Sequence, residues 1–392
     1  MIELNPTMAA KIAAGAYAIR DDIEWAAIQA AGKTAIDMNL GIVDNFTMQA
    51  SDRFKGTSGG NLIRTVAGFG YLAEGVNSRK GELLIGVRGT VHALDWVTDL
   101  SQALRRGPSG HGVHGGFMRT FDSFEPVIGN YLRQSGNLGA VHVVGHSLGG
   151  ALATLVADYL QLRGLHVKLY TFGCPRVGMK DFSQYLTDKL KPENIYRVSN
   201  QSDPVTMVPI FPFMHTPNDR AQYLIPSWHG INPFNHMMGK YIPSVEGQSW
   251  ANLNEAATKK SWSEQAEQWL ETAGSSGSGI QMYSAKTMWM ITKALDWIVG
   301  KVLGGVGATA GLAALGAATV LDQLSQILHQ GILESVKVAE WVGNLIAGIM
   351  KFLGRTAVTG AKMTVHFIRW VLELLFRSIA RMAYMALYNA NK

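Results

Sequence analysis

Residues 141–156 read VHVVGHSLGGALATLV, and this stretch decides the fold. The valine-rich run 141–144 predicts a buried strand, and the Ala- and Leu-rich run from Leu148 to about Leu162 predicts a helix. Between them the chain must turn sharply at Ser147. Gly145 and Gly149 remove the Cβ clashes that such a turn would create. The pattern therefore predicts a serine hydroxyl that stands clear of the chain where a strand becomes a helix.

We interpret Ser147 as a nucleophile. The helix that follows it points free N–H groups and a partial positive charge at the hydroxyl, and such an end suits an oxyanion. The pattern G-x-S-x-G alone arises by chance fairly often, but the strand-forming and helix-forming flanks make it more specific. The alternative is a strand-to-helix turn with no catalytic role.

Composition narrows the classes of protein to consider. The chain has 392 residues, enough for two or three domains, and its 16% of charged residues is low, which indicates buried or membrane-facing surface. The single cysteine, Cys174, excludes an internal disulfide framework. The first 22 residues carry acidic and basic side chains where a signal peptide would have an apolar core, so we expect no Sec-type signal. Export from the cytoplasm would then need a dedicated machine.

The basic excess lies at one end of the chain. From residue 281 onward there are 11 Lys or Arg and 5 Asp or Glu, which accounts for the whole net charge of +6. These basic residues are sparse and embedded in apolar sequence. Nucleic-acid binding is therefore not expected.

Residues 1 to about 245 alternate between strand-like and helix-like runs. The strand-like runs are NLIRTVAGFGYLAE (61–74), ELLIGVRGT (82–90), VKLYTFG (167–173) and NIYRVSN (194–200). The helix-like runs are GGFMRTFDSFEPVIGNYLRQ (115–134) and MKDFSQYLTDKL (179–190). We expect the first two strands to pair through a turn near Asn77. The alternation predicts an α/β fold whose mostly parallel sheet is covered on both faces.

Helices alone are expected after this region. We predict an α/β domain over 1–250, a polar helix and Gly/Ser linker over 251–280, and an apolar, basic helical domain over 281–392. Within the last, Val302–Leu321 has no charge and 11 Gly or Ala in 20 residues. Its glycines at small-xxx-small spacing favour either a tightly packed helical hairpin or a membrane-inserting segment.

The last predicted helix, 361–388, carries one charged stripe. The stripe consists of Lys362, His366, Arg369, Glu373, Arg377 and Arg381. Most other positions are apolar, so the helix could lie on an anionic membrane or pack in a bundle with the stripe in water. For the first alternative we name as membrane contacts Arg369, Trp370, Arg377 and Arg381.

A serine nucleophile needs a base, usually histidine, that is oriented by a carboxylate. When the serine nucleophile lies on an α/β fold with a mostly parallel sheet, the three catalytic residues follow along the chain in the order serine, acid, histidine. Asp203 lies just beyond the strand 194–200 and is the predicted acid, and Asp219 is the alternative. His236 is the predicted base, and His229 and His215 are the alternatives.

The oxyanion also needs hydrogen-bond donors. We predict the N–H of Leu148 as one, and Thr90, which ends an earlier strand, as the other. His146 and His114 are interpreted as structural. No cluster with metal-ligand spacing appears, so no metal or other cofactor is expected.

Several motifs occur together in one order. They are GVRGTVHALDWVTDL, VHGGF, VVGHSLGGALATL, YTFGCPRVG, YRVSNQSDPVTMVP and HMMGKYI. Over residues 55 to 245 the chain thus resembles the class 3 lipase family of α/β-hydrolases. The resemblance implies a triad of Ser147, Asp203 and His236, and an oxyanion residue at Thr90. It also implies an amphipathic lid around 91–97 that opens at a lipid surface, and its candidate lid residues are Val91, Leu94 and Trp96.

The C-terminal part departs from the secreted fungal members of this family, as do the missing signal peptide and disulfides. A lipase core with an apolar helical tail looks similar to bacterial phospholipase effectors of type VI secretion. That resemblance implies a component of the secretion machine and a cognate immunity protein as partners, and a target-cell membrane as the site of action.

The predicted function is cleavage of a membrane phospholipid ester, of phospholipase A type, through an acyl-serine intermediate. One alternative is a triacylglycerol lipase or soluble esterase. Another is a membrane-disrupting pore former with a degenerate lipase domain.

Overall fold

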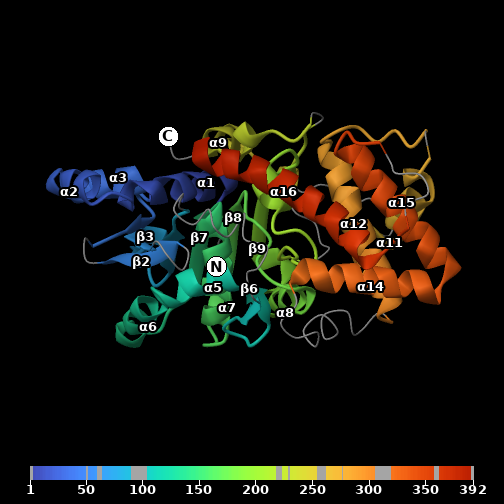
Figure 1. The fold of residues 1–392 in the computed structure, drawn as a ribbon. Helices are drawn as coiled ribbons and strands as arrows, with labels where there is room; N and C mark the ends of the chain where they lie inside the picture. The colour runs from blue at the N-terminus through green and yellow to red at the C-terminus, as the bar shows by residue number, and fades with distance from the viewer. Residues whose placement is uncertain are drawn as a thin grey trace.

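The computed structural model describes residues 3–49, 52–59, 64–89, 104–217, 223–227, 230–253, 262–275, 277–304, 319–356 and 362–389. Within these ranges an eight-stranded sheet has the order β1-β3-β4-β7-β8-β9-β10, with β2 beside β3 (Figure 1). The bounds are β1 (Phe46–Thr47), β2 (Arg53–Gly59), β3 (Arg64–Gly75), β4 (Leu83–Val87), β7 (Ala140–His146), β8 (His166–Phe172), β9 (Ile195–Asn200) and β10 (Tyr223–Ile225). From β4 to β10 all neighbours are parallel, whereas β1, β2 and β4 each pair antiparallel with β3. The predicted α/β fold with a mostly parallel sheet is confirmed.

The central strands are buried on both faces, as parallel strands under two layers of helices must be. All seven residues of β7 are buried. Val141 and Val143 join one apolar cluster, and Val144 joins the other, on the opposite face. This explains why the strand before Ser147 reads as an almost continuous apolar run.

Helices cover the two faces unequally (Figure 1). One face carries α5 (Gly115–Asp122), α6 (Glu125–Gln134), α7 (Leu148–Gln161) and α8 (Lys180–Leu190). The other carries α1 (Pro6–Gly15) and α9 (Met238–Val245), and the short helices α2 (Asp22–Ala30) and α3 (Lys33–Leu40) extend beyond α1. The run 115–134 forms two helices rather than one, because Pro126 lies in the first turn of α6, where its missing N–H costs nothing. A separate hairpin joins β5 (Leu104–Arg106) to β6 (Gly112–His114).

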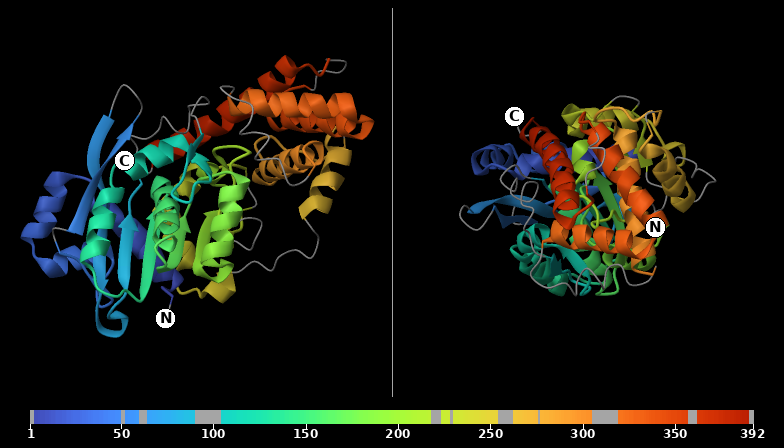
Figure 2. Two further views of the ribbon diagram at one scale, coloured as in Figure 1. Left: turned by 90° about the horizontal axis from the view of Figure 1, so that it is seen from below. Right: turned by 45° about the vertical axis from the view of Figure 1, so that its right-hand side comes forward.

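The C-terminal helices pack together and against the α/β part (Figure 2). They are α11 (Trp262–Ala273), α12 (Ala285–Val302), α14 (Val320–Glu334), α15 (Val336–Phe352) and α16 (Val365–Asn389), preceded by the short α10 (Trp250–Leu253). Their buried side chains, such as Leu295 and Leu345, belong to the same apolar cluster as Val143 of β7. One hydrophobic core therefore runs through both parts, and the domain boundaries stay a prediction.

The apolar segment Val302–Leu321 is described only at its ends, since residues 305–318 lie outside the described ranges. Among the helices that are described, none combines the length and apolarity needed to cross a bilayer.

The longest described helix, α16, takes an unusual path. It leaves the C-terminal helices and runs back over the α/β part (Figures 1 and 2). There it packs against two short 3-10 helices, η5 (Pro204–Met207) and η6 (Pro233–His236). The first of these directly follows Asp203 and the second ends at His236, so α16 lies against both loops that carry the predicted acid and base.

Candidate active site

The turn at Ser147 has the geometry that its glycines predict. Ser147 has φ +59°, in the left-handed region, between the end of β7 and the start of α7. A Cβ at Gly145 would lie 2.2 Å from the carbonyl oxygen of Gly149, and a Cβ at Gly149 would lie 2.3 Å from that of Val87. Larger residues would push α7 away from β7 and β4. The two glycines therefore allow the strained backbone that presents the serine hydroxyl.

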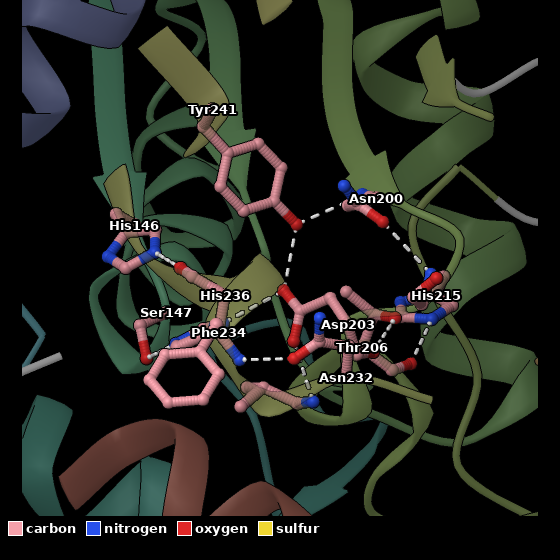
Figure 3. A network of polar contacts seen from close by, with 12 residues as sticks. His146, Ser147, Asn200, Asp203, Thr206, His215, Asn232, Phe234, His236 and Tyr241 are labelled. Carbon is pink, nitrogen blue, oxygen red and sulfur yellow. Dashed lines mark hydrogen bonds and ion pairs between the residues drawn. The ribbon is translucent and has the colours of Figure 1, made fainter. Parts of the chain in front are cut away.

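Three predicted residues come together beside this turn (Figure 3). The Oγ of Ser147 lies 2.8 Å from Nε2 of His236, and Nδ1 of His236 lies 2.8 Å from Oδ2 of Asp203. Asp203 and His236 are completely buried, and Ser147 is 3% exposed. The three residues come from the ends of β7 and β9 and from η6. Their catalytic roles stay predictions.

The hydrogen bonds fix the tautomer of His236. A carboxylate only accepts, so Nδ1 of His236 carries the proton that bonds to Asp203. Nε2 is then free to accept the hydroxyl proton of Ser147. The second oxygen of Asp203 accepts the N–H of Val205 at 2.9 Å, which holds the carboxylate at the start of η5. This arrangement can remove a proton from the serine as its oxygen attacks a carbonyl carbon.

Tyr241 of α9 is a partner that the sequence reasoning missed. Its hydroxyl donates to Oδ2 of Asp203 at 2.8 Å and accepts the N–H of Asn200 at 3.0 Å (Figure 3). Tyr241 is completely buried, and burial together with the neighbouring Asp203 raises the pKa of the hydroxyl well above its usual value. It therefore stays a donor. Within the described residues, the carboxylate of Asp203 thus accepts three hydrogen bonds, from His236, Val205 and Tyr241.

His146 holds the main chain of the predicted base, His236. Its Nε2 lies 2.8 Å from the carbonyl oxygen of His236, which can only accept, so Nε2 carries the proton. Its Nδ1 then accepts the hydroxyl of Tyr17, at 2.8 Å. Burial, and then the neighbouring His236, hold the pKa of His146 well below its usual value. His146 is therefore neutral and structural, and Tyr17, from the N-terminal segment, is a second partner that carried no signal in the sequence.

The other predicted histidines and the alternative acid take different places. His215 donates from Nε2 to the carbonyl oxygen of Thr206 at 2.8 Å and does not reach Ser147. His114 accepts the N–H of Gly116 at the start of α5, which is a structural role. His229 and Asp219 lie outside the described residues.

The oxyanion site is described in part. The N–H of Leu148 opens α7 directly after Ser147, and within the described ranges it takes no part in a hydrogen bond. A Cβ at Gly89 would lie 3.2 Å from the Cβ of Ser147, so the chain after β4 passes beside the nucleophile. The next residue, Thr90, and the lid residues Val91, Leu94 and Trp96 lie outside the described residues.

Cys174 offers no rival nucleophile. It is buried, and burial raises the pKa of its thiol to about 12, so it is not a thiolate near neutral pH. Among the residues that the structure describes, no group of His, Cys, Asp or Glu side chains is placed to hold a metal ion.

The predicted membrane contacts all lie on α16. Arg369 forms ion pairs with Asp322 at 2.5 Å and Glu373 at 2.8 Å. Arg377 also pairs with Glu373, at 2.6 Å, while Trp370 and Arg381 are exposed. Arg369 and Arg377 are thus paired within the molecule, which leaves Trp370 and Arg381 available to a partner.

Comparison with protein families gives one match, which covers the nucleophile turn and Asp203 and ends before His236. Residues 84–213, from β4 through the nucleophile turn to beyond Asp203, match the family model described as lipase (class 3). We call residues 84–213 the class 3 lipase domain, after the family model that they match. The resemblance inferred from the motifs is confirmed for this part of the chain.

The proteins to which the chain is similar in sequence include two kinds of enzyme. A secreted mono- and diacylglycerol lipase 1 from Fusarium solani is 34% identical over 164 residues, which are 40% of this chain and 48% of the relative. A phospholipase A1-II 1 from Oryza sativa subsp. indica is 29% identical over 207 residues, which are 44% of this chain and 51% of the relative. The chain thus spans about half the length of the curated relatives it matches.

Among solved structures, the chain is similar to two fungal lipases. For lipase II from Rhizopus niveus the identity is 25%, the TM-score is 0.41, and the match covers 58% of this chain and 80% of that one. For the lipase from Rhizopus microsporus var. chinensis the identity is 22%, the TM-score is 0.41, and the match covers 63% of this chain and 84% of that one.

Proposed function

We propose that this protein is a lipolytic serine hydrolase that cleaves a carboxylic ester of a membrane phospholipid. The observation that carries the proposal is the chain of hydrogen bonds from Asp203 through His236 to Oγ of Ser147, at 2.8 Å each. It supports acyl transfer because the nucleophile, the base and the orienting acid are in contact before substrate binds.

The acylation step follows from the tautomers. Nε2 of His236 takes the hydroxyl proton while Oγ of Ser147 attacks the ester carbonyl carbon. The oxyanion that forms accepts the N–H of Leu148, with Thr90 as the predicted second donor. Asp203 stabilises the imidazolium. When the ester C–O bond breaks, His236 returns the proton to the leaving alcohol, and the acyl group stays on Ser147.

Deacylation repeats the step with water. His236 accepts a proton from the water that attacks the acyl-serine carbonyl, and then returns a proton to Oγ of Ser147. The products are a free fatty acid and the alcohol, which for a phospholipid is a lysophospholipid. The neutral His146 next to His236 adds no positive charge against the imidazolium.

Two substrate classes are open to this site. Relatives described as phospholipase A1 support phospholipid, and one described as a mono- and diacylglycerol lipase supports acylglycerol. The basic excess from residue 281 onward favours phospholipid, because membranes rich in anionic phospholipid attract basic segments. We keep acylglycerol as the second candidate.

Product analysis separates these candidates. The purified protein and its Ser147→Ala variant are incubated with vesicles of mixed phospholipids and, separately, with an emulsion of diacylglycerol, and the products are identified by mass spectrometry. Lysophospholipid and fatty acid from the native protein alone would support the proposal. Fatty acid from diacylglycerol with intact phospholipid would replace it by an acylglycerol lipase. Hydrolysis by Ser147→Ala at more than a few per cent of the native rate would overturn the role of Ser147.

We further propose delivery of the protein into rival bacteria as an antibacterial effector. A lipase domain followed by apolar, basic helices supports this role, since such an enzyme would damage the membrane of a cell that it enters. The native chain and Ser147→Ala are expressed in a laboratory bacterium, with and without a periplasmic signal. Growth arrest that depends on both Ser147 and one compartment would support the proposal, and unimpaired growth in both compartments would contradict it.

A further inference from the structure

The exposed side of α16 carries aromatic and basic side chains on one line. With about 100° of rotation per residue, Trp370, Arg377, Arg381, Tyr384 and Tyr388 fall within about 60° of one another around the helix. With a rise of about 1.5 Å per residue they extend over about 27 Å of its length. We call these five residues the outer face of α16.

Each member of this face is exposed. The aromatic side chains of Trp370, Tyr384 and Tyr388 are 42%, 40% and 48% exposed, which is unusual for such large rings. Arg377 and Arg381 are exposed between them. Aromatic rings with one polar end, interleaved with arginine, are the side chains that favour the boundary between lipid headgroups and acyl chains.

The charge of this face is positive. Glu373 at its border pairs with Arg369 and Arg377, and Arg369 also pairs with Asp322. The two guanidinium groups are thus balanced by two carboxylates, and Arg381 supplies the excess positive charge. Arg381 forms no ion pair with any residue that the structure describes. The face therefore complements a surface with negative charge, and the rings add affinity for its apolar interior.

The opposite side of α16 connects this face to the candidate active site. Leu375, Ile379 and Ala383 are buried in it, and the helix packs against η5 and η6. Phe234 of η6 is 56% exposed, two residues before His236, and in Figure 3 its ring lies beside Ser147 and His236. An exposed apolar side chain of η6, the 3-10 helix against which α16 packs, thus lies beside the nucleophile.

We propose that the outer face of α16 is a docking surface for anionic phospholipid membranes. α16 then lies in the plane of the membrane and holds the loops of Asp203 and His236 at the lipid surface. Docking itself is independent of the ester that is cleaved, whereas delivery of that lipid to Ser147 rests on the proposed function.

Binding is tested without hydrolysis, in the Ser147→Ala background. Vesicles of phosphatidylethanolamine with about one third phosphatidylglycerol, and vesicles of phosphatidylcholine alone, are titrated by co-sedimentation. The test variant is Arg377→Gln/Arg381→Gln. The control is Lys189→Gln/Lys191→Gln, which removes the same charge from exposed positions at the end of α8. A second variant, Trp370→Ser/Tyr384→Ser, removes the rings.

We expect the arginine variant to lose about 25-fold in affinity for the anionic vesicles, since each of the two basic residues near such a surface contributes about fivefold. The control should stay within about twofold, and the ring variant should weaken binding to both kinds of vesicle. Equal losses in the arginine variant and the control, or unchanged binding in both α16 variants, would overturn the proposal.

Hydrolysis is measured with Ser147 intact. On a soluble short-chain ester, without vesicles, both α16 variants should retain turnover within about twofold. On anionic vesicles at low lipid concentration, the arginine variant should lose about 25-fold, in line with its affinity. If the native protein binds vesicles through this face and cleaves no lipid in them, the proposed function fails and the docking surface stands. If vesicle hydrolysis is the same in the native protein and the arginine variant, the docking surface is wrong and the proposed function stands.

Discussion

Removal of the Tyr241 hydroxyl tests most directly whether its hydrogen bond to Asp203 supports the site. In Tyr241→Phe, Asp203 loses a donor at 2.8 Å, and the buried N–H of Asn200 loses its acceptor. A hydrogen bond to a charged group contributes about 1.5–3 kcal/mol, so we expect turnover of a soluble ester to fall about tenfold or more, with stability lower by about 1–3 kcal/mol. Steady-state kinetics and urea unfolding measure both.

Tyr131→Phe serves as the control, because it removes a tyrosine hydroxyl that donates to Glu74 far from the site. It should leave turnover unchanged. Equal turnover in Tyr241→Phe and the native protein would remove Tyr241 from the account of the site.

At the scale of residues, the order of residues along the chain predicted the partners of Ser147, which the sequence around each partner could not do alone. Ser147 was predicted from its own glycines and flanking runs, whereas Asp203 and His236 were predicted mainly from their order after it, and the structure brings the three into contact. Tyr17 and Tyr241 could not be chosen. Each acts through one hydroxyl, and its partner lies 129 or 38 residues away, so nothing in the surrounding sequence marks it.

The strand, turn and helix around Ser147 form the element on which the site depends. Gly145→Ala would place a Cβ 2.2 Å from the carbonyl oxygen of Gly149, so β7 and α7 must separate. We expect a loss of about 3 kcal/mol or more in unfolding free energy and a large loss of turnover, because overpacking shifts the backbone that aims Ser147. Chemical unfolding and ester turnover measure the two effects.

Gly136→Ala is the matched control. A Cβ there would meet no atom within 4 Å, so it should change neither stability nor turnover appreciably. A Gly145→Ala protein as stable and active as the control would show that the close approach is not needed.

At the scale of elements, long periodic runs were predictable and breaks within them were not. The strands 167–173 and 194–200 correspond to β8 and β9 within one residue at each end. The run 115–134 was predicted as a single helix-like run from its helical spacing. The structure divides it at Phe124, since Pro126 starts a new helix more readily than it continues an old one.

In the whole molecule, one core joins the C-terminal helices to the class 3 lipase domain. Leu375 of α16 is completely buried in it. We expect Leu375→Ala to cost about 2–5 kcal/mol and to lower the unfolding temperature of the entire chain in a single transition, because a shared core couples its two parts. Differential scanning calorimetry tests this.

Leu333→Ala, which truncates a leucine that is 73% exposed on α14, should cost less than about 0.5 kcal/mol. Two separate transitions, of which Leu375→Ala shifts only one, would show that the C-terminal helices form an independent domain, as the sequence alone predicted. Composition and linkers could suggest that boundary, but they carry no information on which apolar faces meet.

Acid should destabilise the whole molecule through its buried histidines. Burial is the main cause that lowers the pKa of His142 to about 4, so the unfolded chain binds a proton more readily than the folded one. The contribution of His142 to the free energy of unfolding is therefore complete above about pH 6.5 and is lost as the pH falls toward 4. At pH 5 the loss from this residue is about 2 kcal/mol. Urea unfolding at pH 7 and pH 5 should show a smaller loss in His142→Gln than in the native chain. Equal losses in the two proteins would show that protonation of His142 does not cause the loss of stability in acid.

The central claim is that Ser147 is the nucleophile of a working triad, and covalent trapping tests it most directly. The protein is treated with an alkyl fluorophosphonate, whose phosphorus would bond to Oγ of Ser147 as fluoride leaves. Intact-mass measurement and peptide mapping follow. We predict one adduct per chain, on Ser147, none in Ser147→Ala, and labelling slowed at least a hundredfold in His236→Ala, since general-base catalysis contributes about that much or more. No adduct on the folded native protein, or an adduct that persists in Ser147→Ala, would contradict the account.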